Sequence, residues 1–162
     1  MGQLRYGPRP TVDREVTATK IGAWSTSLTA TFLTDPAVVA AVLPPPLKPP
    51  SQPLVKVSIS HVDLGGGRPP FGAGTFAVAA RHRDTEGFYP LLMPMTTEQS
   101  VIGGRETFGE PKKLADVTLD VGEGLDTAST VIGTVSRMGV GIIELGGTLG
   151  DELAPPPADE RL

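Results

Sequence analysis

The chain contains no cysteine and only two histidines, and these shortages exclude several classes of protein. Without cysteine there is no disulfide framework, no thiolate nucleophile and no cysteine-based metal site. No stretch approaches the roughly 18 consecutive apolar residues of a membrane-spanning helix, and no run of Lys and Arg forms the basic stripe of a nucleic-acid-binding protein. The net charge of −4 also argues against a nucleic-acid-binding protein. We therefore expect a cytoplasmic protein without nucleic acid, membrane or metal among its partners.

Aromatic residues are also scarce, at 5%, whereas glycine (20 residues) and proline (17 residues) are abundant. This composition favours many short strands joined by turns over a bundle of helices. A chain of 162 residues is long enough for one domain with a real core. We expect a single domain over residues 1–162, in which residues 1–12 form a loose leader and residues 154–162 a proline-rich tail.

Stretches of alternating or largely apolar residues indicate a series of strands. The clearest is 54–64, where Val55, Val57 and Ile59 alternate with polar side chains, as in a half-buried strand. The glycines at 65–67 predict a hairpin turn, because the Lys-Ser/Thr ending of a phosphate-binding loop is missing. The expected strands are 21–34, 54–64, 75–82, 88–95, 114–121, 128–137 and 140–149, the last two apolar enough for central positions in a sheet.

Two short helices are expected between these strands. An N-cap at Asp35 followed by Pro36 begins a helix over 37–43, and Thr97 caps a helix from 98 to about 108. The order of elements predicts an α+β fold that is mostly antiparallel β, arranged as an open barrel with two short helices.

The adjacent lysines Lys112 and Lys113 are the candidate catalytic residues. A lysine becomes a nucleophile when desolvation or a second cation lowers its pKa. The neutral amine then condenses with a ketone to form a Schiff base, whose protonated imine withdraws electrons from the neighbouring carbon. That chemistry supports decarboxylation of a β-keto acid, or aldol chemistry, without a metal or organic cofactor. In an extended segment the two side chains point to opposite faces, so only one can enter a given pocket.

The run Gly-Arg-Glu-x-x-Gly-x-Pro-Lys-Lys-Leu-Ala-Asp at 104–116 resembles the active-site signature of the acetoacetate decarboxylase family. That family is the standard example of a lysine activated by its surroundings. Further segments that resemble the family are 32–36 with 42–47, 97–100, and 134–139. The resemblance implies a cone-like open β-barrel, a small keto acid or related carbonyl compound as substrate, no cofactor, and Lys112 as the nucleophile.

The resemblance also implies that the chain lacks the C-terminal part of the family fold. In relatives, a similar proline-rich linker leads into further strands that complete the barrel, whereas this sequence ends within residues 154–162. An open barrel would leave a gap beside Lys112, which we expect a second copy of the chain to cover in a homo-oligomer.

Four further residues are candidates for substrate binding: Arg105, Glu106, Met93 and Phe108. Arg105 and Glu106 form a structural ion pair that orients the lysine loop, or else Arg105 binds the substrate carboxylate through a bidentate contact. Met93 and Phe108, together with Met95 and Leu114, are expected to form an apolar wall around the amine. His61 and His82 have no partner motif, and we expect ordinary strand residues there.

The sequence departs from the family at three pocket positions. The family's pocket arginine and two glutamates align with Ser25, Ser58 and Ala73, none of which carries charge. Three functions therefore stay open. They are a Schiff-base decarboxylase of an acetoacetate-like β-keto acid, a Schiff-base aldolase or dehydratase acting on another carbonyl substrate, and a non-catalytic binding domain that is a remnant of the family.

Overall fold

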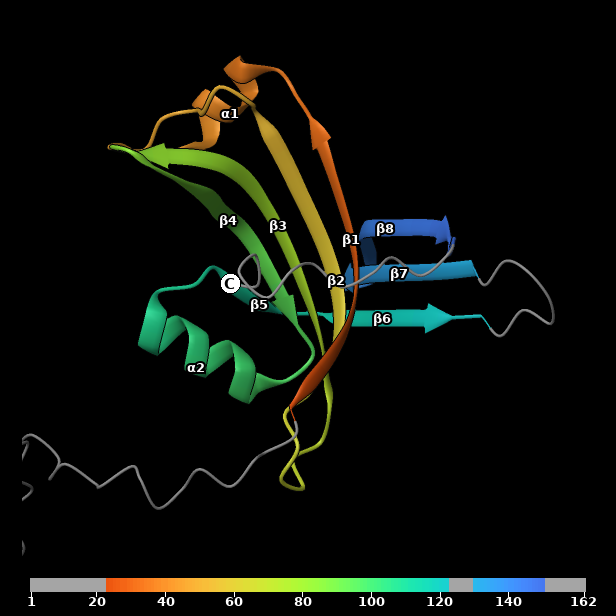
Figure 1. Cartoon of the computed structure of the whole chain (residues 1–162). Coiled ribbons are helices and arrows are strands. Elements are labelled where there is room, and N and C mark those ends of the chain that lie inside the picture. The colour runs from red at the N-terminus through yellow and green to blue at the C-terminus, as the bar shows by residue number, and fades with distance from the viewer. Residues whose placement is uncertain (1–22, 123–129, 151–162) are drawn as a thin grey trace, which may run out of the picture.

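The computed structural model describes residues 23–122 and 130–150 (Figure 1), so the expected leader and proline-rich tail lie outside the described residues. The elements are β1 (Trp24–Leu33), α1 (Pro36–Val42), β2 (Leu54–Asp63), β3 (Phe71–His82), β4 (Thr85–Met95), α2 (Glu98–Phe108), β5 (Lys112–Leu114), β6 (Asp116–Val121), β7 (Thr130–Arg137) and β8 (Val140–Thr148).

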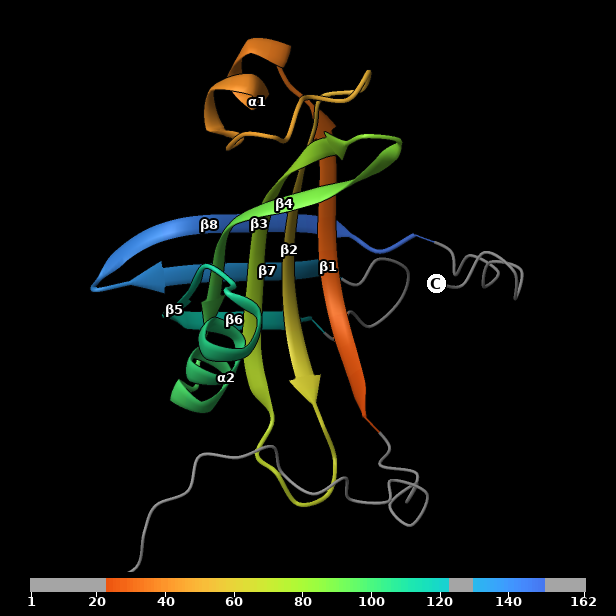
Figure 2. The ribbon, with the colours of Figure 1, turned by 90° about the vertical axis from the view of Figure 1, so that its left-hand side faces the viewer.

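The strands form two separate sheets that do not close into a barrel. The large sheet has the order β1-β2-β3-β4-β5, and the small sheet has the order β6-β7-β8. All neighbouring strands are antiparallel except β4 and β5, which run parallel because α2 makes the connection between them. In Figure 2 the small sheet crosses behind the large sheet, and α2 lies on the opposite side. The expected open, mostly antiparallel α+β fold with two short helices is confirmed.

Strand alternation gives the large sheet two faces with different neighbours. We call the face that carries Ser58, Ala73 and Lys112 the front face, and the face that carries Val57 and Ile59 the back face. The helix α2 packs against β5 and β4. Figures 1 and 2 place that helix on the front face. The lysine motif therefore lies where a helix and the front face meet.

The hydrophobic core lies on the back face. At one end of the sheet, Val39 and Leu43 at α1 pack against buried side chains of β2 and β3. At the other end, Ile59 packs with Ala115 and with Val135 of the small sheet. Gly133 lets the two sheets approach closely here, since a Cβ atom at this position would lie 2.9 Å from Cδ1 of Ile59. This packing fixes the position of the small sheet behind the large one.

Both helices begin where the sequence predicts. The Asp35 carboxylate accepts a hydrogen bond from the Ala37 N–H at 2.7 Å, and the Thr97 hydroxyl accepts one from the Ser100 N–H at 3.4 Å. The residues at 65–67 form the expected turn between β2 and β3, with φ between 63° and 75° in all three glycines.

Two expectations about the strands were wrong. Residues 114–121 do not form one strand, because the chain leaves the large sheet at Ala115, whose N–H donates to the Met95 carbonyl at 2.9 Å, and enters the small sheet at Asp116. The strand β8 is an edge strand instead of a central one, and its Val140 and Ile142 side chains are 63% and 45% exposed. Local apolar content does not reveal how many neighbours a strand has.

Candidate active site

Lys112 lies at the start of β5, directly after the turn that follows α2. The segment is held against β4, because the Met93 N–H donates to the Pro111 carbonyl at 3.1 Å. Lys112 pairs with Met93 and therefore points to the front face, where its side chain is only 15% exposed. Lys113 pairs with Pro94, points to the opposite face and is exposed. The expected division of the two lysines between opposite faces is confirmed.

The turn between α2 and β5 is built by Gly109. This glycine adopts φ 69° in the left-handed region, which ends the helix without the strain that a side chain would add. The Gly109 N–H donates to the Arg105 carbonyl at 3.1 Å, and the Glu110 N–H donates to the Gly104 carbonyl at 3.2 Å. The first is the 5→1 bond of an αL cap, and the second joins the next residue on each side of it; together they fold the chain back so that residues 110–112 lie against the last turns of α2.

Gly104 makes room for the amine. It is a buried residue of α2, and a Cβ atom at this position would lie 2.6 Å from Nζ of Lys112 and would also overlap Lys112 Cδ and the Glu110 carboxylate. With any side chain at this position, the side chains of Lys112 and Glu110 would have to move. The Lys112 side chain thus passes across the bare surface of the helix, and this contact removes much of it from water.

The group nearest to the amine is a carboxylate. Nζ of Lys112 lies 2.8 Å from Oε2 of Glu110, whose side chain is 29% exposed. The expectation of an apolar wall was wrong in part, because Phe108 is 76% exposed and Leu114 is 47% exposed, whereas Met95 is 4% exposed. Phe108 is the last residue of α2 and its side chain stays in solvent, although its position four residues after Gly104 puts it on the same side of the helix.

Two arginines cover the open edge of β5. The Arg105 guanidinium donates to the Lys112 carbonyl at 3.4 Å, and Arg137 Nε donates to the Leu114 carbonyl at 3.1 Å. The expected ion pair between Arg105 and Glu106 does not form. Within residues 23–122 and 130–150, the ion pair that is present joins Lys112 and Glu110. Arg105 nevertheless contacts the lysine loop, through a backbone carbonyl instead of a side chain.

The three uncharged positions share the front face with the lysine. Ser25 and Ser58 lie on β1 and β2, and Ala73 lies on β3, all on the face to which Lys112 points. Adjacent strands are roughly 5 Å apart, so Ser58, three strands from Lys112, is on the order of 14 Å away along the sheet. On β1 and β2 the front face carries hydroxyls, among which Thr29 and Ser58 are 3.0 Å apart and Ser27 and Ser60 are 2.7 Å apart.

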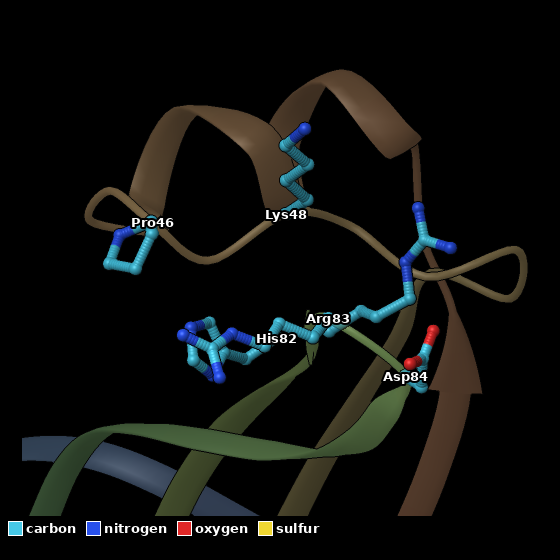
Figure 3. Close-up of a pocket in the computed structure, with 6 residues that line it drawn as sticks. Pro46, Lys48, His82, Arg83 and Asp84 are labelled. Atoms are coloured by element: carbon cyan, nitrogen blue, oxygen red, sulfur yellow. The ribbon is translucent and has the colours of Figure 1, made fainter.

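A concave region lies at the far end of the large sheet. A cavity of about 570 Å³ opens between the loop after α1 and the turn between β3 and β4 (Figure 3). Its lining residues are Pro46, Lys48, Arg81, His82, Arg83 and Asp84. It includes none of the residues around Lys112, so His82 belongs to a different surface from the candidate active site. His61 instead contacts the Trp24 ring, with 6.2 Å between ring centroids.

None of the helices in residues 23–122 and 130–150 is long and apolar enough to cross a membrane. Across those residues, no three or more His, Asp or Glu side chains gather in a group that could hold a metal ion.

Sequence reasoning missed three residues of the site: Gly104, Glu110 and Arg137. All three lie in segments that carry the family resemblance, at 104–116 and 134–139. The segments that resemble the family therefore contained these residues, but a glycine and a glutamate near the end of a helix are common for structural reasons alone. Only the folded chain brings Arg137 of β7 to the Leu114 carbonyl, across 23 positions of sequence.

The fold and the site define an open two-sheet α+β protein that presents one shielded lysine amine from an edge strand to the front of its larger sheet. A family model described as "Acetoacetate decarboxylase (ADC)" matches residues 6–162, and this chain belongs to that family. The chain is 31% identical over 105 residues to "Acetoacetate decarboxylase 1" of Bradyrhizobium diazoefficiens, a match that covers 65% of this chain and 42% of the relative.

Two other proteins extend the comparison. The chain is 35% identical over 129 residues to a "CLA biosynthesis isomerase" of Lactiplantibacillus plantarum, covering 74% of this chain and 42% of that protein. The crystal structure of acetoacetate decarboxylase from Legionella pneumophila is similar with a TM-score of 0.67 and 27% identity, over 83% of this chain and 50% of the other. The chain therefore spans about half the length of the relatives it matches.

Proposed function

We propose that this chain carries the lysine site of a cofactor-free lyase that decarboxylates an acetoacetate-like β-keto acid, with Lys112 as the Schiff-base nucleophile. The observation that carries the proposal is the amine itself. It points from β5 to the front face, is 15% exposed, and crosses a helix position that has no side chain. Membership of the acetoacetate decarboxylase family supports the same chemistry.

In this reaction the Lys112 amine attacks the keto carbon, and water leaves to give a protonated imine. The bond to the carboxylate carbon then breaks, its electron pair moves toward the imine nitrogen, and carbon dioxide departs. The resulting enamine takes up a proton at carbon, and water hydrolyses the imine to release the ketone and the free amine. The helix α2 shields the amine on one side and so limits the access of water to the reacting nitrogen.

A Schiff-base reaction on a different carbonyl substrate, such as an aldol or dehydration reaction, is the second candidate. The observation that favours it is the lack of charge at Ser25, Ser58 and Ala73, which lie on the same face as the amine. A site without those charges has lost groups that would recognise a small keto acid in the family pattern. The match to a relative named as an isomerase is consistent with a family that hosts more than one reaction.

Borohydride trapping tests the proposal. The chain is incubated with acetoacetate or with pyruvate, reduced, digested and mapped by mass spectrometry, while carbon dioxide release is measured in parallel. An adduct on Lys112 together with carbon dioxide from acetoacetate supports the decarboxylase. An adduct without carbon dioxide release supports the second candidate. The absence of any adduct would contradict both and favour a non-catalytic binding domain.

We also propose that the protein works as a homo-oligomer. The large sheet ends at β1 and the small sheet at β8, and neither edge has a further strand beside it within the described residues. Unpaired strand edges are surfaces on which a second copy of a chain can pair.

A further inference from the structure

The partner of the candidate nucleophile is unexpected for a lysine that must lose its proton. The Glu110 carboxylate lies 2.8 Å from Nζ of Lys112, and both side chains are largely shielded, at 29% and 15% exposure. A carboxylate this close forms an ion pair with a lysine ammonium, which must give up a proton before its nitrogen can act as a nucleophile. The same carboxylate is also the nearest group that can accept that proton.

The pair is held in place by several independent features. The Glu110 N–H is anchored on the Gly104 carbonyl after the turn at Gly109, and Pro111, whose ring restricts φ, separates the two residues by a single position. Gly104 leaves the space that both side chains occupy, since a Cβ atom there would overlap the Glu110 carboxylate as well as Lys112. The Lys112 N–H also donates to the Glu110 carbonyl, at 2.7 Å.

Stability does not account for this arrangement. Partly shielded ion pairs contribute little, because the loss of hydration offsets the attraction between the charges. A lysine that only anchored the turn could point to solvent, as Lys113 does on the opposite face. The geometry instead places a proton acceptor at the atom that has to react.

We propose that Glu110 is a catalytic residue that transfers protons to and from the reacting atoms while the Schiff base forms, an inference that rests on the proposed role of Lys112 as the nucleophile. Glu110 first takes a proton from the Lys112 ammonium, which leaves a neutral amine and a neutral carboxylic acid. The amine attacks the keto carbon, the C–N bond forms, and the electron pair of the carbonyl π bond moves to oxygen.

Glu110 then relays a proton from nitrogen to that oxygen and gives a neutral carbinolamine. In the last step the Glu110 acid protonates the hydroxyl, which departs as water, and the nitrogen lone pair forms the C=N bond. The three ammonium protons end as one on the imine nitrogen and two in the water molecule. The protonated imine and the Glu110 carboxylate remain as an ion pair, in place of the one seen between Lys112 and Glu110.

The test compares the rates at which Lys112 forms a borohydride-trapped adduct with acetoacetate and with pyruvate in Glu110→Gln, in Glu110→Asp and in the parent chain. General acid–base catalysis contributes about 100-fold or more. We therefore expect Glu110→Gln to lower the rate about 100-fold and Glu110→Asp to recover part of it. Glu86→Gln is the matched control, an exposed glutamate at the start of β4 whose loss leaves the rate unchanged.

Glu110→Ala separates a chemical role from a structural one, because it leaves space for a small carboxylate. Added formate should restore its rate of adduct formation, and a merely structural loss would not respond to formate. A Glu110→Gln rate equal to or higher than that of the parent chain would overturn the inference, since Glu110 would then only restrain the amine. If the parent chain forms no adduct with either compound, the proposed function fails first, so the two failures are distinguishable.

Discussion

Replacing Gly104 by alanine adds one methyl group at the point where α2 meets the lysine. The new Cβ would lie 2.6 Å from Nζ of Lys112 and would overlap the Glu110 carboxylate, so the lysine has to move. Alanine is favoured over glycine within a helix by about 1 kcal/mol, and overpacking costs about 1–3 kcal/mol. Because the overlapping atoms belong to flexible side chains, we expect a net loss of roughly 0–2 kcal/mol in the free energy of unfolding.

The effect on chemistry should be much larger. A displacement of about 1 Å in a reacting group lowers a rate on the order of 100-fold. We therefore expect Gly104→Ala to lower the rate of adduct formation with acetoacetate about 100-fold, while thermal unfolding followed by circular dichroism changes little. The assay is the rate of borohydride-trapped adduct on Lys112, measured at equal concentrations of folded protein.

Gly103 provides the matched control for this prediction. It lies next to Gly104 in α2, but nothing lies within 4 Å of a Cβ atom at this position. Gly103→Ala should gain about 1 kcal/mol in stability from helix propensity and keep the parent rate of adduct formation. Equal adduct rates in Gly103→Ala and Gly104→Ala would refute the reasoning, because the contact between the helix and the lysine would then be irrelevant to reactivity.

Three further predictions concern the lysines, the core and the sheet edge. Lys112→Ala should abolish adduct formation and Lys113→Ala should only reduce it, measured by mass spectrometry of the reduced protein; an adduct on Lys113 in the Lys112→Ala variant would contradict this. Gly133→Ala should destabilise the chain by about 1–3 kcal/mol in thermal unfolding, because its Cβ would press on Ile59, and an unchanged midpoint would show that the two sheets adjust freely. Ile142→Lys, at a 45% exposed position of the edge strand β8, should shift sedimentation equilibrium toward the monomer if copies of the chain associate there.

Local sequence patterns were enough to predict several structural features of this protein. The helix from Glu98 to Phe108 was predicted with the observed bounds, because Thr97 and Gly109 mark its ends through interactions within a few residues. The placement of Lys112 and Lys113 on opposite faces followed from the period of an extended chain alone. Each of these features depends on backbone geometry over one or two turns, which neighbouring residues decide.

Other features depend on contacts between segments far apart in the chain. The stretch 114–121 is divided between two sheets because Ala115 meets Met95 and Val135, and its alternating pattern continues through the division. The strand β8 lies at an edge because of the strands beside it, although its composition resembles that of a central strand.

The surroundings of the amine also depend on how separate elements of the chain pack together. Phe108 and Glu110 are both close to Lys112 along the chain, and only the packing of α2 on β5 decides which of them approaches Nζ. The bare surface at Gly104 and the turn at Gly109 bring the carboxylate to the amine and leave Phe108 in solvent. The sequence alone therefore predicted Lys112 as the candidate nucleophile, and the tertiary structure showed which side chain lies beside its amine, because proximity between side chains depends on how whole elements pack.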